Sequence, residues 1–245
     1  MSNAFVLSGV FLSLILATAC QTKRAEVSND AANTNRTTLT EERSTTSQDV
    51  QKVTIDSPDG VKLIGSFFAA ETPKSPALLL LHQWQSDRHS YDDFAKRMQA
   101  RGFAVLSIDG RGFGESVKTS DGRDITAERT DAAVKAMLTD VGAAFDFLAK
   151  QQNVDPAKIG IVGASYGSSL ALIYAADEPK VAAAALLSPG LNYFGNMPTE
   201  PAIKKYGDRP LYMIAADDDK DSADAVKKLA AAGNNSRYGE KIYPE

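Results

Sequence analysis

The 245-residue sequence is poor in the side chains that build metal sites and covalent cross-links. It has one cysteine, Cys20, and therefore cannot form an internal disulfide or a thiolate metal cluster. Its two histidines, His82 and His89, are too few for a histidine-rich metal site. The formal net charge of −4 leaves no basic face for a phosphate backbone. We therefore expect no metal and no nucleic-acid partner.

Nucleotide-binding motifs are missing as well. No P-loop pattern occurs, and the glycine-rich run at residues 110–115 lacks the last small residue of the dinucleotide fingerprint. The acidic run at residues 217–219 does not start an EF-hand, because the glycine and glutamate of that loop are absent from their places. We expect no cofactor.

The first 49 residues differ in composition from the rest of the chain. Residues 4–19 are uncharged and apolar, a run that is short for a membrane span and typical of a signal peptide. The run leads into Cys20 through Ala-Thr-Ala, which resembles a bacterial lipoprotein signal and implies that Cys20 carries a lipid. The alternative is an ordinary cleaved signal. We expect a signal peptide over residues 1–20 and, from its polar composition, a disordered tether over residues 21–49. The protein would then be exported and anchored in a bacterial membrane through Cys20.

Residues 50–245 alternate between strand-like and helix-like segments and form one expected domain. A leading pair of strands around the turn Ser-Pro-Asp-Gly predicts an antiparallel hairpin. Strand–helix alternation after it predicts a mostly parallel central sheet with helices on both faces. The predicted strands are 51–56, 61–70, 77–81, 103–108, 158–162, 182–187, 211–215 and 241–243, and the predicted helices are 90–101, 132–150, 168–176 and 223–232. In such a sheet the functional site lies at the carboxyl ends of the strands.

One strand–turn–helix segment carries a nucleophile pattern. Gly163-Ala164-Ser165-Tyr166-Gly167 fits G-x-S-x-G, with an apolar strand before it and a helical segment after it. Such a tight turn needs glycine where two backbone segments approach closely. It lifts the Ser165 hydroxyl above the sheet edge, near the amino end of a helix, where developing negative charge is favoured. The alternative is a simple Gly/Ser-rich connection.

With this turn, two further segments resemble the α/β-hydrolase family, in particular its dienelactone-hydrolase-like and esterase-like bacterial members. Leu79-Leu80-Leu81-His82-Gln83-Trp84 is similar to the family's strand followed by His-Gly. Residues 109–116 are close to its D-x-R-G-x-G-x-S loop. The resemblance covers nearly all of residues 50–245 and implies an α/β-hydrolase fold. Dienelactone hydrolase itself uses a cysteine nucleophile, whereas this chain has Ser165.

The resemblance also implies roles for other residues. The family's acid follows the next-but-one strand after the nucleophile, and its spacing selects Asp219, with Asp218 as the alternative. The alternative for this acidic run is that it only caps the next helix. The oxyanion donors would be the amide of Tyr166 and that of Trp84, or of Gln83 if the loop is shifted by one residue.

A histidine base is the missing part. The family carries it in a Gly-x-x-His-Gly turn after the last strand, and no histidine follows Asp219 in this sequence. We therefore expect a domain that lacks its C-terminal His-bearing segment. His82 is expected beneath the oxyanion loop and His89 at the start of a helix, and neither lies on the element where the family has its base.

The resemblance therefore implies a serine hydrolase of carboxylic esters that works through an acyl-enzyme on a small-molecule ester or acyl substrate. Without its base, this chain would be weak or inactive. A peptidase or thioesterase would use the same parts. A tethered binding module that has lost turnover is the non-enzymatic alternative.

Overall fold

The computed structural model describes residues 50–244. The expected signal peptide, tether and lipidation site at Cys20 lie outside these residues. Within the described part, no helix is long and apolar enough to cross a bilayer. The described residues belong to one compact unit.

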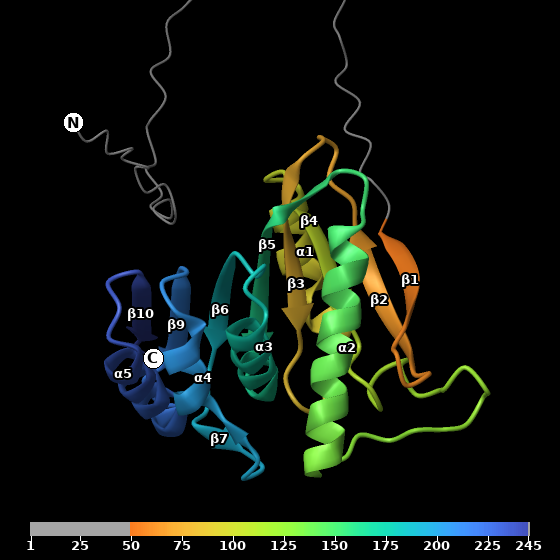
Figure 1. Cartoon of the computed structure of the whole chain (residues 1–245). Helices are drawn as coiled ribbons and strands as arrows, with labels where there is room; N and C mark the ends of the chain where they lie inside the picture. The colour runs from red at the N-terminus through yellow and green to blue at the C-terminus, as the bar shows by residue number, and fades with distance from the viewer. Residues whose placement is uncertain (1–49, 245) are drawn as a thin grey trace, which may run out of the picture. The chain divides into compact units, whose positions relative to one another are not determined.

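A central sheet of eight strands has the order β1-β2-β4-β3-β5-β6-β9-β10 (Figure 1). From β4 to β10 all neighbouring strands are parallel, whereas β2 is antiparallel to both β1 and β4. The predicted leading hairpin and mostly parallel sheet are thus confirmed. The strands are β1 (Gln51–Asp56), β2 (Lys62–Phe68), β3 (Ser75–Leu81), β4 (Ala104–Ile108), β5 (Val154–Ala164), β6 (Ala183–Leu187), β9 (Leu211–Ala216) and β10 (Tyr238–Tyr243).

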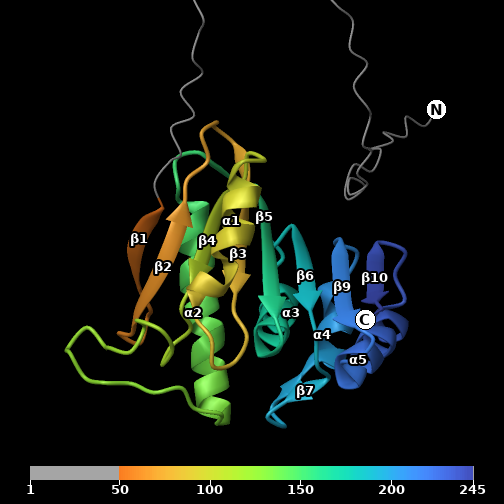
Figure 2. The ribbon, with the colours of Figure 1, turned by 180° about the vertical axis from the view of Figure 1, so that it is seen from behind.

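Helices cover the two faces of the sheet unequally. Figure 1 shows α2 and α3 in front of the sheet, and Figure 2 shows α1 on the opposite face. The larger apolar core lies beneath α2, α3, α4 and α5, and a smaller one lies beneath α1, around Phe68, Leu80 and Val105. The helices are η1 (Arg88–Tyr91), α1 (Asp92–Gln99), α2 (Asp131–Ala149), α3 (Tyr166–Asp177), α4 (Thr199–Tyr206) and α5 (Lys220–Gly233), of which η1 is a 3₁₀ turn.

Buried apolar runs explain the central strands. In β3 and β4 the side chains from Leu79 to Leu81 and from Ala104 to Ile108 are almost fully buried, as expected for parallel strands covered on both faces. The helix α2 starts at a cap, since the Thr130 hydroxyl accepts the amide of Ala133 at 3.2 Å.

The segment between β6 and β9 differs from the sequence prediction. The sequence predicts no strand or helix between residues 187 and 211, but the chain forms a short hairpin, β7 (Asn192–Tyr193) with β8 (Met197–Pro198), followed by α4. Short strands and a helix that begins at a proline give little periodicity in the sequence. This hairpin reaches the candidate site.

Candidate active site

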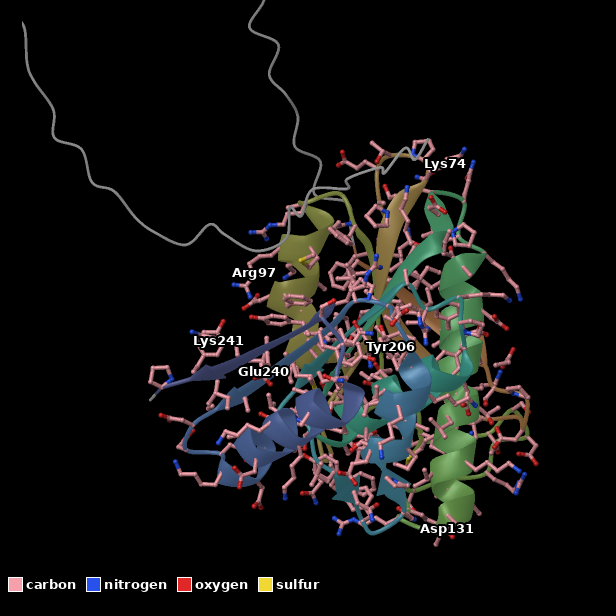
Figure 3. All side chains as sticks on the ribbon, turned by 60° about the vertical axis from the view of Figure 1, so that its left-hand side comes forward. Lys74, Arg97, Asp131, Tyr206, Glu240 and Lys241 are labelled. Carbon is pink, nitrogen blue, oxygen red and sulfur yellow. The ribbon has the colours of Figure 1, made fainter. Side chains whose placement is uncertain are left out.

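The carboxyl ends of the parallel strands meet at one edge of the sheet. Figure 3 marks the two edges: Lys74 precedes β3 at the top, and Asp131 begins α2 at the bottom. The loop after β3, the turn after β5, the β7–β8 hairpin and the acidic run after β9 all start from the lower edge. The predicted site residues Trp84, Ser165 and Asp219 follow β3, β5 and β9, and β6 separates the last two strands in the sheet.

Ser165 has the backbone of a nucleophile turn. Its φ of 52° and ψ of −122° lie in a region that non-glycine residues rarely adopt. A Cβ on Gly163 would collide with the backbone of Gly167, and a Cβ on Gly167 would lie 2.5 Å from the carbonyl oxygens of Leu81 and His82. Both glycines are therefore needed for the chain to turn from β5 into α3 so close to the end of β3. Ser165 is held by its own amide, which donates to Leu187 O at 2.8 Å.

Tyr193, in β7, contacts the predicted nucleophile, Ser165. The Ser165 Oγ donates to Tyr193 Oη at 3.1 Å, and Tyr193 Oη donates to the carbonyl oxygen of Ser188 at 3.2 Å. A Cβ on Gly190 would lie 2.6 Å from the Tyr193 ring, so this glycine makes room for the ring. Sequence reasoning missed Tyr193, because no motif predicts a contact made by so short a hairpin.

The two residues expected to supply the oxyanion donors lie side by side. The rings of Trp84 and Tyr166 pack edge to face, with centroids 5.2 Å apart. Trp84 also packs against Phe113 and Phe194, at 4.8 Å and 4.7 Å. Burial raises the pKa of the Tyr166 phenol, so this group stays neutral. The ring cluster fixes the loop after β3 against the start of α3, which brings the two backbone segments together.

His82 holds two loops together. The ring is buried, its Nε2 accepts the amide of Gly110 at 3.0 Å, and its Nδ1 lies 2.7 Å from the carbonyl oxygen of Gln83. Nε2 must carry the lone pair, so Nδ1 carries the proton and donates it. Burial lowers the pKa of His82 and favours this neutral form. Both nitrogens are occupied, and the ring is not placed to take a proton from Ser165.

His89 is exposed and turned to its own helix. Its Nδ1 lies 2.9 Å from Asp92 Oδ2, one turn further along the chain. His82 and His89 are the only histidines of the sequence, so residues 50–244 bring no imidazole to the Ser165 hydroxyl.

Asp219 lies at the N-cap of α5. Its carboxylate accepts the amide of Ser222 at 3.2 Å, which is the capping role that we held open as the alternative for this acidic run. The Asp218 carboxylate accepts the amide of Asp219 at 3.0 Å. One oxygen of a capping carboxylate remains available to orient an imidazole, so the cap does not exclude the acid role.

The D-x-R-G-x-G-x-S segment proves to be a scaffold of buried ion pairs. The Asp109 carboxylate is fully buried, pairs with the Arg88 guanidinium, and accepts the amides of Arg88 and Glu115 at 2.7 and 2.8 Å. Arg111 donates to both carboxylate oxygens of Asp140 at 2.6 Å. A Cβ on Gly114 would collide with the Asp109 carboxylate. This loop supports Phe113, which packs on Trp84.

The pocket beneath these residues is small. It holds about 20 Å³, room for one water molecule, between His82, Tyr166 and Leu170. Among residues 50–244, no group of three His, Cys, Asp or Glu side chains is arranged to hold a metal ion.

Comparison with known proteins identifies the class. The sequence matches the family described as serine aminopeptidase, S33, over residues 72–216, which is more than half of the chain. The protein is a member of the α/β-hydrolases. Within them, it belongs to the serine aminopeptidase S33 family.

Individual proteins are similar to this chain in sequence or in fold. An uncharacterized protein of Mycobacterium tuberculosis is 31% identical over 138 residues, which cover 56% of this chain and 44% of that protein. The chain therefore spans less than half of this relative. An esterase of Pyrococcus furiosus superposes with a TM-score of 0.66 at 17% identity, over 80% of this chain and 82% of the esterase. Dienelactone hydrolase from Anabaena variabilis gives 0.62 at 20% identity, over 80% and 86%. These two structures share the fold.

Proposed function

We propose that the protein is a serine hydrolase of carboxylic esters, with Ser165 as the nucleophile. The observation that carries the proposal is the backbone of Ser165, whose positive φ is held between two glycines that tolerate no Cβ. Strain of this kind is costly and persists where a side chain must be presented for chemistry. The esterase folds among the structural neighbours support an ester substrate.

In the proposed reaction, Ser165 Oγ bonds to the carbonyl carbon of the ester, and its proton passes to a base. The resulting oxyanion accepts hydrogen bonds from the amides of Tyr166 and Trp84, a pair that contributes about 10²–10³ in rate per donor. The alkoxide then leaves with the proton, and water hydrolyses the acyl-Ser165 ester in the same way. Asp219 would orient the base and stabilise its charged form.

Within residues 50–244, neither histidine is placed to act as the base, because His82 is hydrogen-bonded at both nitrogens and His89 is turned to Asp92. We therefore propose that this chain turns over slowly on its own. Imidazole added to the solution can stand in for a missing histidine, so it should accelerate hydrolysis of p-nitrophenyl acetate in a way that depends on Ser165.

The test compares the protein with its Ser165→Ala variant, with and without imidazole, after subtracting the reaction of imidazole alone. We expect a slow rate that imidazole raises and that the variant abolishes. Fluorophosphonate labelling of Ser165 gives an independent readout. If Ser165 neither labels nor contributes to the rate at any imidazole concentration, the binding module without turnover replaces this proposal.

A peptidase is the second candidate, because the matched family is described as serine aminopeptidase. Acyl transfer from an amide uses the same groups but needs a proton donor for the leaving amine. Aminoacyl p-nitroanilides tested beside p-nitrophenyl esters separate the two. Faster turnover of the anilide would favour the peptidase.

We also propose that the domain is exported and tethered to a membrane through a lipid on Cys20. The apolar residues 4–19 directly before this only cysteine support the proposal. When the full sequence is expressed in a bacterium, the protein should partition into the detergent phase of Triton X-114, and Cys20→Ser should move it to the aqueous phase. Equal partitioning of both would refute the lipid anchor.

A further inference from the structure

An arginine covers the aromatic cluster at the site. The Arg129 guanidinium carbon lies 4.9 Å from the ring centroid of Trp84 and 4.7 Å from that of Phe194. A guanidinium over two aromatic faces is held in place by cation–π attraction while its N–H groups stay free to donate. The residue itself is exposed.

The backbone beneath this arginine is clamped. Asn196, in the β7–β8 turn, donates its Nδ2 to the carbonyl oxygen of Arg129 and to Asp131 Oδ1, both at 2.9 Å. The loop before α2 and the β7–β8 hairpin are therefore joined, although 65 residues separate Asn196 from Asp131. The hairpin that holds Tyr193 on Ser165 also holds Arg129.

Three other arginines of the described residues have carboxylate partners, and Arg209 donates to backbone carbonyl oxygens instead. Arg88, Arg111 and Arg123 pair with Asp109, Asp140 and Asp121. Within residues 50–244, no carboxylate lies within ion-pair distance of the Arg129 guanidinium. The Arg129 guanidinium thus lies beside the rings with N–H groups that no carboxylate of the described residues accepts.

We propose that Arg129 binds a carboxylate of the substrate, so that the preferred ester carries an anionic group on its acyl part. Phe194 lies under Arg129, and the preceding residue, Tyr193, contacts Ser165 Oγ. Two adjacent residues thus connect the guanidinium to the proposed nucleophile, and one ligand can reach both. A half-ester of a dicarboxylic acid has this form. The inference rests on the proposed hydrolase function, since it names the substrate class of the same site.

Trp84 reports on this site without any turnover, because it is the only tryptophan of the sequence. Its fluorescence is titrated with monomethyl glutarate and with dimethyl glutarate, which differ in one negative charge. We expect the monoester to bind at least about tenfold more tightly, as a charge-assisted hydrogen-bonded pair does. Monomethyl succinate and monomethyl adipate, run alongside, report the best distance between the two groups.

Three variants complete the experiment. Arg129→Gln should weaken monoester binding about tenfold and leave diester binding unchanged, and Arg129→Lys should keep part of the preference. Arg123→Gln, on the same loop and paired with Asp121, is the matched control and should change neither. Equal binding of the two esters, no binding of the monoester, or equal weakening of both by Arg129→Gln would overturn the inference. Ser165 labelling, measured on the same samples, tests the hydrolase proposal separately, because it does not depend on a carboxylate.

Discussion

Gly167→Ala tests whether the start of α3 must touch the end of β3. The new Cβ would lie 2.5 Å from the carbonyl oxygens of Leu81 and His82, where ordinary contacts begin at 3.4 Å. The two segments must therefore separate by about 0.9 Å. Neither neighbour is the flexible end of a side chain, so the backbone itself has to move.

Two effects follow from this displacement. Overpacking of this kind costs about 1–3 kcal/mol, and a domain of this size loses about 2–4 °C in melting temperature per kcal/mol. Gly167→Ala should thus lower Tm by about 2–12 °C. The same shift moves the amide of Trp84 away from Ser165, and a misplacement near 1 Å costs about 10²-fold in rate. Calorimetry measures the first effect, and the rate of fluorophosphonate labelling with imidazole present measures the second.

Gly142→Ala is the matched control, because it lies within α2 and its new Cβ would meet only the Tyr174 ring, at 3.4 Å. This variant should keep the labelling rate and gain up to about 1 kcal/mol from helix propensity. If Gly167→Ala melts and labels like the parent protein, the close approach of α3 to β3 described above is wrong.

Three further outcomes test the site. Tyr193→Phe removes the hydroxyl that accepts the hydrogen bond of Ser165 Oγ. Because one hydrogen bond is worth about 1 kcal/mol, fluorophosphonate labelling should become about fivefold faster. Slower labelling would instead give Tyr193 a role in the reaction. Asp109→Asn leaves the buried Arg88 with the half-exposed Glu115 as its remaining charge partner and should cost about 3 kcal/mol in urea unfolding, and a cost below 1 kcal/mol would contradict the pairing. Burial lowers the pKa of His82, so below about pH 6.5 the unfolded chain binds a proton that the folded one does not, and stability should fall as the pH drops from there. Melting curves at several pH values should show a shallower fall for His82→Gln than for the parent protein, and equal falls would contradict the reasoning.

The order of strands and helices could be predicted because buried parallel strands are continuous apolar runs. Ile159–Val162 and Leu79–Leu81 carry this signal, and the glycines around Ser165 identify the turn between β5 and α3. The positions of Trp84 and Asp219 after their strands follow from the same pattern. Each of these features is encoded within a few residues of itself.

The rest depends on contacts between distant segments. Nothing near Tyr193 in the sequence indicates that its hydroxyl meets Ser165, 28 residues earlier. Asp109 belongs to the family-like loop, but no local pattern indicates that it is buried as a pair with Arg88. The contact of Asn196 with the loop before α2 is equally invisible, since it needs the β7–β8 turn to form first.

The positive φ of Ser165 lowers the stability of the folded domain, while the proposed reaction requires the serine hydroxyl at this position. A β-branched side chain fits this backbone region poorly, so threonine is no conservative substitute for serine here, although it carries the same hydroxyl. Glycine fits it without strain and removes the proposed nucleophile, so Ser165→Gly should yield an inert domain that is harder to unfold. If stability alone mattered, glycine would be the better residue at this position. Serine at this position therefore costs the folded domain some conformational strain.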